Sequence, residues 1–322
     1  MRPKKVITAL ESLLNAGLAV MLHGSPGVGK SDVVRQIAQR RGIDLIDLRL
    51  SQLDSVDLRG VPSVKAGKTA WNVPQFLPTS GKGILFLDEI NSAPQATQAA
   101  AYQLVLDRRL GEYELPDGWH IVAAGNKSTD RAIVNQMSTA LKNRFAHIDF
   151  DVDLDDWCAW AYSKNVPDAL ISFLRFRPTL LNTFDPKNRD VMAFATPRSW
   201  EFLSRVLHTN DYETFAGIVG EGPAAELQGY LGSIGAMPDI DELLKDPTGA
   251  PVPKEPAQLY AVCAALVYRT EPKTIETIAK YIARVPNEMQ VMFYKDATAR
   301  MPVLLDHDVF NKWLKENKDV LF

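Results

Sequence analysis

The feature that most constrains this chain is a glycine-rich loop, GSPGVGKS, set between an apolar run and a segment with helical periodicity. The run at residues 18–24, LAVMLHG, predicts a buried strand, and Val33, Val34, Ile37 and Ala38 predict the following helix. The loop fits the pattern G-x-x-x-x-G-K-[ST] in the strand–loop–helix setting that this pattern requires. We therefore expect the chain to bind the phosphates of a nucleotide; a chance match in a turn is the alternative.

The chemistry of such a loop depends on its backbone as much as on its side chains. Glycines allow the backbone N–H groups to point at phosphate oxygens, and the helix N-terminus that follows attracts negative charge. We predict that Lys30 contacts the β- and γ-phosphates of ATP and that Ser31 offers its hydroxyl to Mg²⁺. The residues predicted to bind the nucleotide here are Gly24, Ser25, Pro26, Gly27, Val28, Gly29, Lys30 and Ser31.

A second motif, ILFLDE, ends an apolar run with two acidic residues. In this setting we predict that Asp88 holds Mg²⁺, usually through water, and that Glu89 either acts as the general base or polarises the attacking water. The alternative is a core strand that reaches the surface at its acidic end. Asn126 closes a later run, VAAGN, and we predict that its amide contacts the γ-phosphate. The alternative there is an asparagine that stabilises a turn.

Three arginines are candidates for charge stabilisation. Arg144, in ALKNRF, is predicted to reach the γ-phosphate held by a neighbouring subunit, and Arg131 is a second candidate for that role. Arg198 lies in the first turn of a helix predicted to begin at Pro197 and to have Thr196 as its N-cap. Because a helix N-terminus is a slightly poor place for a cation, we predict that Arg198 reaches the nucleotide from a second domain and couples the nucleotide state to domain motion. The alternatives are ordinary surface arginines at helix ends.

Strand and helix patterns alternate up to residue 152, which predicts an α/β domain with a parallel five-stranded sheet flanked by helices. We predict an α/β nucleotide-binding core at 1–153, a helical lid at 154–245, and a linker with a helical C-terminal extension at 246–322. We also expect one hairpin around Gly67 and Trp71, and another that turns at Pro116-Asp117-Gly118. The expected strands are 18–24, 44–50, 83–89, 120–125 and 147–152.

Composition narrows the classes of partner. The chain has 36 Lys and Arg against 39 Asp and Glu, a net charge of −3, which argues against a nucleic-acid partner.

Its two cysteines form no disulfide framework, which fits a reducing compartment. No run approaches the roughly 18 apolar residues of a membrane span. Glu11, Ser12 and Asn15 interrupt the N-terminal apolar stretch, so we expect a cytoplasmic helix there instead of a signal peptide.

Taken together, GSPGVGKS, ILFLDE, AAGN, ALKNRF and TPRSW resemble the AAA+ ATPases of the MoxR type over roughly residues 1–210. The resemblance implies an AAA+ core with an all-helical lid, ATP and Mg²⁺ as cofactors, and hydrolysis of ATP to ADP and phosphate. It further implies a homo-hexameric ring that acts, like a chaperone, on a protein client or a von Willebrand factor A domain partner. It assigns sensor 1 to Asn126, the arginine finger to Arg144 and sensor 2 to Arg198. The chain departs from the family pattern at Asn143, where an acid is usual, and at Lys127, where proline is frequent.

Two other functions compete with this one. A nucleic-acid motor of the helicase-loader or branch-migration type is disfavoured by the charge balance. A scaffold that binds ATP with little turnover is disfavoured by the presence of Asp88, Glu89, Asn126 and Arg144.

The aromatic residues in the predicted hairpins admit two interpretations. Segments 62–78, with Trp71, and 110–119, with Tyr113 and Trp119, either line the pore of a ring and grip a polypeptide or form surface hairpins packed locally.

Overall fold

The computed structural model describes residues 1–127, 130, 137–188, 191–235 and 237–317 of the chain. The chain divides into two compact units. Unit 1 is Met1–Val152 together with Asp185–Arg189, and unit 2 is Asp153–Phe184 together with Asp190–Phe322.

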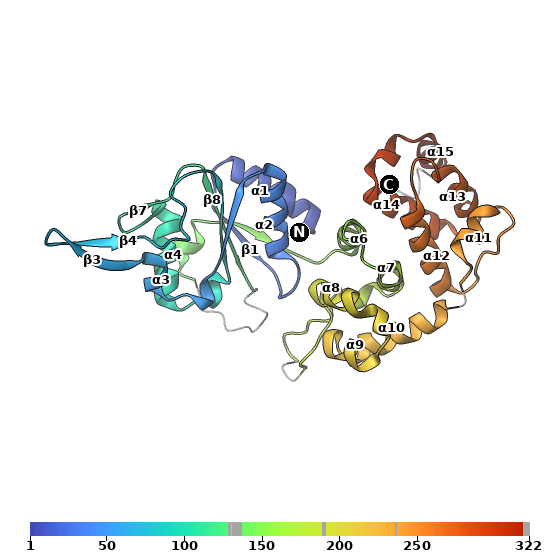
Figure 1. Cartoon of the computed structure of the whole chain (residues 1–322), viewed down its shortest axis with the longest axis horizontal. Helices are drawn as coiled ribbons and strands as arrows, with labels where there is room; N and C mark the ends of the chain where they lie inside the picture. The colour runs from blue at the N-terminus through green and yellow to red at the C-terminus, as the bar shows by residue number, and fades with distance from the viewer. Residues whose placement is uncertain (128–129, 131–136, 189–190, 236, 318–322) are drawn as a thin grey trace. The chain divides into compact units, whose positions relative to one another are not determined.

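Unit 1 is built on a five-stranded sheet with the strand order β2-β5-β8-β1-β9. Figure 1 labels β1 and β8 of this sheet. Every neighbouring pair of strands is parallel, so each connection must cross over a face of the sheet. The predicted parallel sheet flanked by helices is confirmed. Its strands are β1 (Val20–His23), β2 (Asp44–Arg49), β5 (Gly83–Asp88), β8 (Trp119–Gly125) and β9 (Ala146–Asp149).

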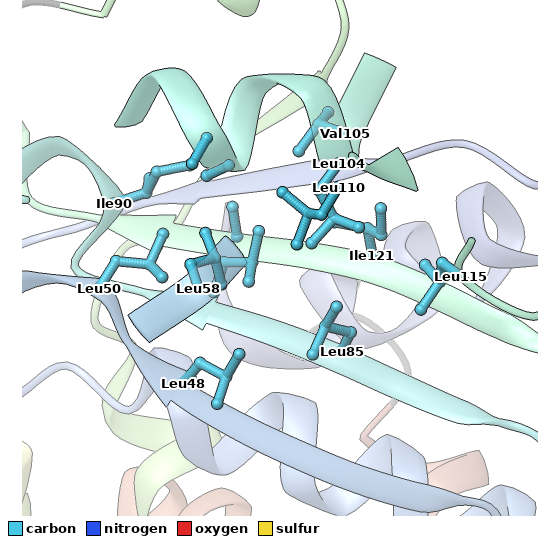
Figure 2. Close-up of a cluster of buried hydrophobic side chains, with 14 of the residues drawn as sticks. Leu48, Leu50, Leu58, Leu85, Ile90, Leu104, Val105, Leu110, Leu115 and Ile121 are labelled. Atoms are coloured by element: carbon cyan, nitrogen blue, oxygen red, sulfur yellow. The ribbon is translucent and has the colours of Figure 1, made fainter. Parts of the chain in front are cut away.

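Helices cover both faces of this sheet. The helices α1 (Pro3–Asn15) and α2 (Lys30–Arg41) pack on one face, and α3 (Ser55–Arg59) and α4 (Gln95–Asp107) pack on the other. Since side chains alternate along a strand, Ile84 and Phe86 of β5 join the first cluster, whereas Leu85 and Leu87 join the second. Figure 2 shows this second cluster, with Leu85 on the sheet and Leu104 on α4. Burial on both faces explains why the strands read as continuous apolar runs.

Two antiparallel hairpins are inserted into unit 1. The first pairs β3 (Val61–Lys65) with β4 (Lys68–Asn72), as predicted around Gly67 and Trp71, and extends away from the sheet (Figure 1). The second pairs β6 (Arg109–Leu110) with β7 (Tyr113–Glu114).

The predicted turn of the second hairpin at Pro116-Asp117-Gly118 is wrong. Its two strands are joined at residues 111–112, where Gly111 takes a positive φ of 60°. The Pro116 segment does turn the chain, since Trp119 N–H donates to the Pro116 carbonyl at 3.0 Å. That turn leads directly into β8, which pairs in parallel with β5 and β1 and not with the preceding segment.

The described part of unit 2 is helical. The helix α8 (Pro197–Val206) begins as predicted, because the Thr196 hydroxyl accepts a hydrogen bond from Ser199 N–H at 3.1 Å. Apart from Asp185–Arg189, which belong to unit 1, the predicted lid and C-terminal extension fall within unit 2, and the boundary between them at residue 245 stays a prediction. The remaining helices are α6 (Leu154–Ser163), α7 (Asp168–Phe176), α9 (Tyr212–Val219), α10 (Glu221–Ile234), α11 (Ile240–Lys245), α12 (Pro256–Arg269), α13 (Ile275–Ile282), α14 (Asn287–Arg300) and α15 (Asp308–Glu316).

A buried ionic cluster fastens three helices of unit 2 together. The Arg175 guanidinium on α7 donates to Asp155 on α6 at 2.5 Å and to Asp296 on α14. The Tyr162 hydroxyl donates to the same Asp296 carboxylate at 3.3 Å. Asp296 is almost fully buried, and among the described residues its carboxylate is stabilised by the Arg175 guanidinium and the Tyr162 hydroxyl. Across both units, none of the helices in the described ranges has the length and apolar character needed to span a bilayer.

Candidate functional site

The predicted site residues of unit 1 lie at one edge of the sheet. Parallel strands end at the same edge, and ligands of such sheets bind outside those carboxyl ends, where the strand order reverses. Here β1 lies between β8 and β9, whereas the next strand in sequence, β2, lies at the far edge. The neighbouring ends of β1, β8, β5 and β2 therefore bring together the glycine-rich loop, Asn126, Asp88 with Glu89, and the segment after Arg49.

The glycine-rich loop wraps around the ammonium group of Lys30, the first residue of α2. Lys30 Nζ donates to the carbonyls of Gly24 at 2.6 Å and Ser25 at 3.0 Å, and it lies 3.5 Å from Asn126 Oδ1. Gly29, the N-cap of α2, has φ 103°, a conformation that side-chain-bearing residues rarely adopt. The loop therefore combines a positive charge with the exposed N–H groups of a helix N-terminus, an arrangement suited to phosphate.

Ser31 and Asp88 form the pair that could hold a divalent cation. Ser31 Oγ donates to Asp88 Oδ2 at 3.0 Å, and Glu89 N–H donates to Asp88 Oδ1 at 2.9 Å. Mg²⁺ takes octahedral oxygen ligands at about 2.1 Å, so two adjacent ligands stand about 3.0 Å apart. The two oxygens already have that separation, and the remaining positions would suit waters and phosphate oxygens. The residues thus fit Mg²⁺.

Glu89 is held by a serine that the sequence analysis missed. Ser51, in the short helix η1 (Leu50–Gln52) directly after β2, donates its hydroxyl to the Glu89 carboxylate. Glu89 itself has φ 57° and ψ 31°, a left-handed conformation that costs an ordinary residue about 1–2 kcal/mol. Such strain is typical of functional positions. The only sequence signal for Ser51 was its place immediately after a predicted strand.

Asn126 ends β8 and receives support from a second residue missed by the sequence analysis. Asn91, in the short helix η2 (Ile90–Ser92) after Glu89, donates from Nδ2 to the Asn126 carbonyl at 2.7 Å. Asn91 is only 4% exposed. No sequence pattern singled it out, because its partner is 35 residues away along the chain.

Two histidines border the loop. His23 ends β1, and its Nε2 lies 2.8 Å from Nδ1 of His147 on β9, with the rings stacked. Burial lowers the pKa of His23 below its usual 6.5, and the charge of His147 lowers it further. Lys127 and Lys30 act in the same direction, whereas Asp149 opposes them. The imidazole of His23 is therefore neutral near pH 7, and Lys30 supplies the positive charge of the loop.

The three candidate arginines have separate positions. Arg144 follows the short helix α5 (Thr139–Lys142) in unit 1 and is exposed. Within the described residues its guanidinium has no hydrogen bond or ion pair. Arg198 is the second residue of α8 in unit 2, and its role as sensor 2 stays a prediction. Arg131 lies outside the described residues.

The hairpin aromatics differ from one another in exposure. Tyr113 is buried and donates its hydroxyl to the Pro78 carbonyl at 2.7 Å, and Trp119 is buried and donates Nε1–H to the Ser80 carbonyl at 2.9 Å. Local packing is thus the correct interpretation for these two. Trp71 on β4 is 38% exposed and Val64 on β3 is 80% exposed. Of the two hairpins, the β3–β4 hairpin alone is still a candidate surface for contact with a polypeptide.

Comparison with known families agrees with this geometry. Residues 19–145 match the family model described as AAA domain, dynein-related subfamily. This segment contains the glycine-rich loop, Asp88, Glu89, Asn126 and Arg144, so residues 19–145 are similar to AAA domains of this subfamily, and the parallel sheet fits the AAA+ fold.

The matching curated proteins cover only parts of this chain. The denitrification regulatory protein NirQ of Pseudomonas aeruginosa is 29% identical over 154 residues, which are 45% of this chain and 59% of NirQ. Midasin of Dictyostelium discoideum is 35% identical over 101 residues, which are 30% of this chain and 2% of midasin. The chain thus spans less than two thirds of the length of these relatives.

Solved structures resemble the chain more weakly. The RuvB Holliday junction branch migration motor of Thermotoga maritima is 18% identical, with a TM-score of 0.40 and coverage of 88% of this chain and 86% of that one. NtrX of Brucella abortus is 13% identical, with a TM-score of 0.42 and coverage of 97% and 67%. Similarity at this level carries no conclusion about function.

Proposed function

We propose that this AAA+ chain is a Mg²⁺-dependent ATPase of the MoxR type that uses ATP hydrolysis to remodel or activate a protein partner. The observation that carries the proposal is the convergence of Lys30, the Ser31–Asp88 pair, Glu89 and Asn126 at one sheet edge. Each group has the chemistry that phosphoryl transfer to water requires.

Each of these residues has its own proposed role in ATP hydrolysis. Lys30 would bind the β- and γ-phosphates, and Ser31 with Asp88 would hold Mg²⁺, which would supply positive charge to the phosphate oxygens. Glu89 accepts a proton from water as the water oxygen bonds to the γ-phosphorus. The bond from that phosphorus to the bridging oxygen breaks, and ADP leaves with that oxygen. Asn126 offers its amide to the γ-phosphate and the attacking water.

A homo-hexameric ring would complete the site. The exposed guanidinium of Arg144 has no partner among the described residues of unit 1, so it is available to a phosphate bound by a neighbouring subunit. An arginine supplied in this way stabilises the charge of the transition state.

The β3–β4 hairpin is the surface proposed for the protein partner. In the observed register, Pro62 and Val64 share one face with Thr69 and Trp71, and all four are exposed. An isolated two-stranded hairpin is marginally stable in water, so an exposed apolar face on it favours a role in binding. A client polypeptide or a von Willebrand factor A domain would fit this surface, and the net charge of −3 disfavours nucleic acid.

Phosphate release by wild type and by Glu89→Gln tests the proposal, with each protein also passed through size exclusion with and without ATP. We expect wild type to release phosphate and to form a ring with ATP. Glu89→Gln should bind ATP but turn over on the order of 10²–10⁴ times more slowly. If the protein binds ATP but neither hydrolyses it nor assembles, the results would instead favour an ATP-binding scaffold with little turnover. If DNA stimulates ATP turnover, the results would instead favour a nucleic-acid motor.

A further inference from the structure

Asn91 links the turn that carries Glu89 to the strand end that carries Asn126. The turn begins at Glu89, whose carbonyl accepts a hydrogen bond from Ser92 N–H at 2.9 Å. Asn91 lies inside this turn, and its Nδ2 donates to the Asn126 carbonyl at 2.7 Å. One buried side-chain amide therefore spans the gap between the segment after β5 and the end of β8.

Among the described residues, the other half of this amide has no hydrogen-bond partner. Asn91 Oδ1 is buried and, among the described residues, accepts no hydrogen bond. The amide cannot turn over, because Oδ1 would then face the Asn126 carbonyl, which is also an acceptor. A buried acceptor without a partner costs stability, and such atoms in native proteins call for a functional explanation.

The strand end is shaped to receive this amide. A Cβ added to Gly125 would lie 2.4 Å from Asn91 Oδ1 and 2.6 Å from its Cγ, distances that real side chains do not reach. The nearest atoms to that Cβ are all in the Asn91 side chain. The end of β8 can therefore approach the amide only because residue 125 is glycine.

We infer that Asn91 is a positioning residue that fixes Asn126 relative to Glu89 for the attack of water on ATP. The inference rests on the proposed ATPase function. Lys30 Nζ has contacts of its own with the carbonyls of Gly24 and Ser25, and Ser31 pairs with Asp88. The groups proposed to bind the β-phosphate and Mg²⁺ thus have contacts that do not involve Asn91. Loss of Asn91 should therefore slow the chemical step and leave the affinity for ADP, which has no γ-phosphate, unchanged.

Asn91→Asp is the most direct test, because it keeps the shape and replaces the donor with a carboxylate oxygen against the Asn126 carbonyl. We expect kcat for phosphate release to fall on the order of 10²-fold, the effect of displacing a reacting group by about 1 Å. The Kd of ADP should remain close to that of wild type. Gln98→Glu is the matched control: Gln98 is buried, and its Nε2 donates to the Ala93 carbonyl at 3.1 Å, outside the site. Both variants should lower Tm, but only Asn91→Asp should lower kcat.

A measurement without nucleotide tests the contact itself. Gly125→Ala should lower Tm, because its methyl group collides with the Asn91 amide. In the double variant Asn91→Ala/Gly125→Ala the methyl group has room. The Tm loss of the double variant should therefore be smaller than the sum of the losses of the two single variants.

Three outcomes would overturn the inference while the ATPase proposal stands. These are wild-type kcat in Asn91→Asp, an equal loss of kcat in Gln98→Glu, and additive Tm losses for Asn91 and Gly125. Absence of phosphate release from wild type would instead reject the proposed function, and the inference with it.

Discussion

The hydroxyl of Ser51 donates a hydrogen bond to the carboxylate of Glu89 across the neighbouring ends of β2 and β5. Glu89 is the proposed general base, and a base that accepts a hydrogen bond from a protein donor is less available to water. The two strands are direct neighbours, with Arg49 opposite Asp88. A shift of either strand end therefore changes how firmly the base is held.

Ser51→Ala should raise the basal rate of ATP hydrolysis. Removal of the hydroxyl eliminates a donor that competes with water for the Glu89 carboxylate, and a rise in kcat of about three- to tenfold is expected. Steady-state phosphate release at saturating ATP measures it. Ser51→Thr keeps the hydroxyl and should retain the wild-type rate. A lower rate in Ser51→Ala would mean that Ser51 orients Glu89 productively.

Arg144→Ala should lower kcat by about 10³-fold or more while the affinity for ATP is retained. The reason is that an arginine supplied by a neighbouring subunit stabilises mainly the transition state. Lys142→Ala is a matched control, since Lys142 is also exposed and lies two residues away. A similar loss in both variants would indicate a general effect of surface charge.

Mixing two inactive variants tests whether Arg144 acts between subunits. Arg144→Ala retains the base, and Glu89→Gln retains the arginine, so mixed assemblies contain sites with both groups. Phosphate release should therefore reappear on mixing. If the mixture stays inactive although the two proteins assemble together, Arg144 does not act on a neighbouring site.

Tyr113 and Trp71 should respond in opposite ways to substitution. Tyr113→Phe removes the hydrogen bond to the buried Pro78 carbonyl, a loss of about 1 kcal/mol, which lowers Tm of a unit of this size by about 2–4 °C. Trp71→Ala should leave Tm nearly unchanged, since Trp71 is exposed, but should weaken remodelling of the partner without changing ATP turnover. Thermal unfolding and a partner-remodelling assay distinguish the two. Loss of remodelling in a stable Tyr113→Phe protein would contradict the assignment.

Stability should fall as the pH falls below about 6.5, in part because of His23. Its pKa in the folded protein is lowered, chiefly by burial, so the unfolded chain binds the proton more readily. The stability present above pH 6.5 is lost as the pH falls toward the folded pKa. His120 acts in the same direction, since burial also lowers its pKa.

Thermal unfolding of wild type and His23→Gln at about pH 7.5 and about pH 5.5 measures this effect. The variant should lose less Tm on acidification than wild type. The difference should be small, because solvent screens a half-exposed imidazole. Equal losses in both proteins would exclude His23 as a contributor.

Elements that depend on a few consecutive residues could be predicted from the sequence. The glycine-rich loop, the apolar strand ending in Asp88 and Glu89, and the N-cap of α8 at Thr196 are each specified by a few consecutive residues. Alternation of strand and helix then predicted the parallel sheet, because parallel strands require crossover connections.

The residues that support the site became apparent from the three-dimensional arrangement of the strands. Ser51 reaches Glu89, and Asn91 reaches Asn126, only because the strand order makes β2, β5 and β8 neighbours. Tyr113 is buried rather than exposed for the same kind of reason, since its partner Pro78 belongs to a different segment. Contacts between residues 35 or more positions apart depend on where the strands lie in the sheet, and no local pattern records that order.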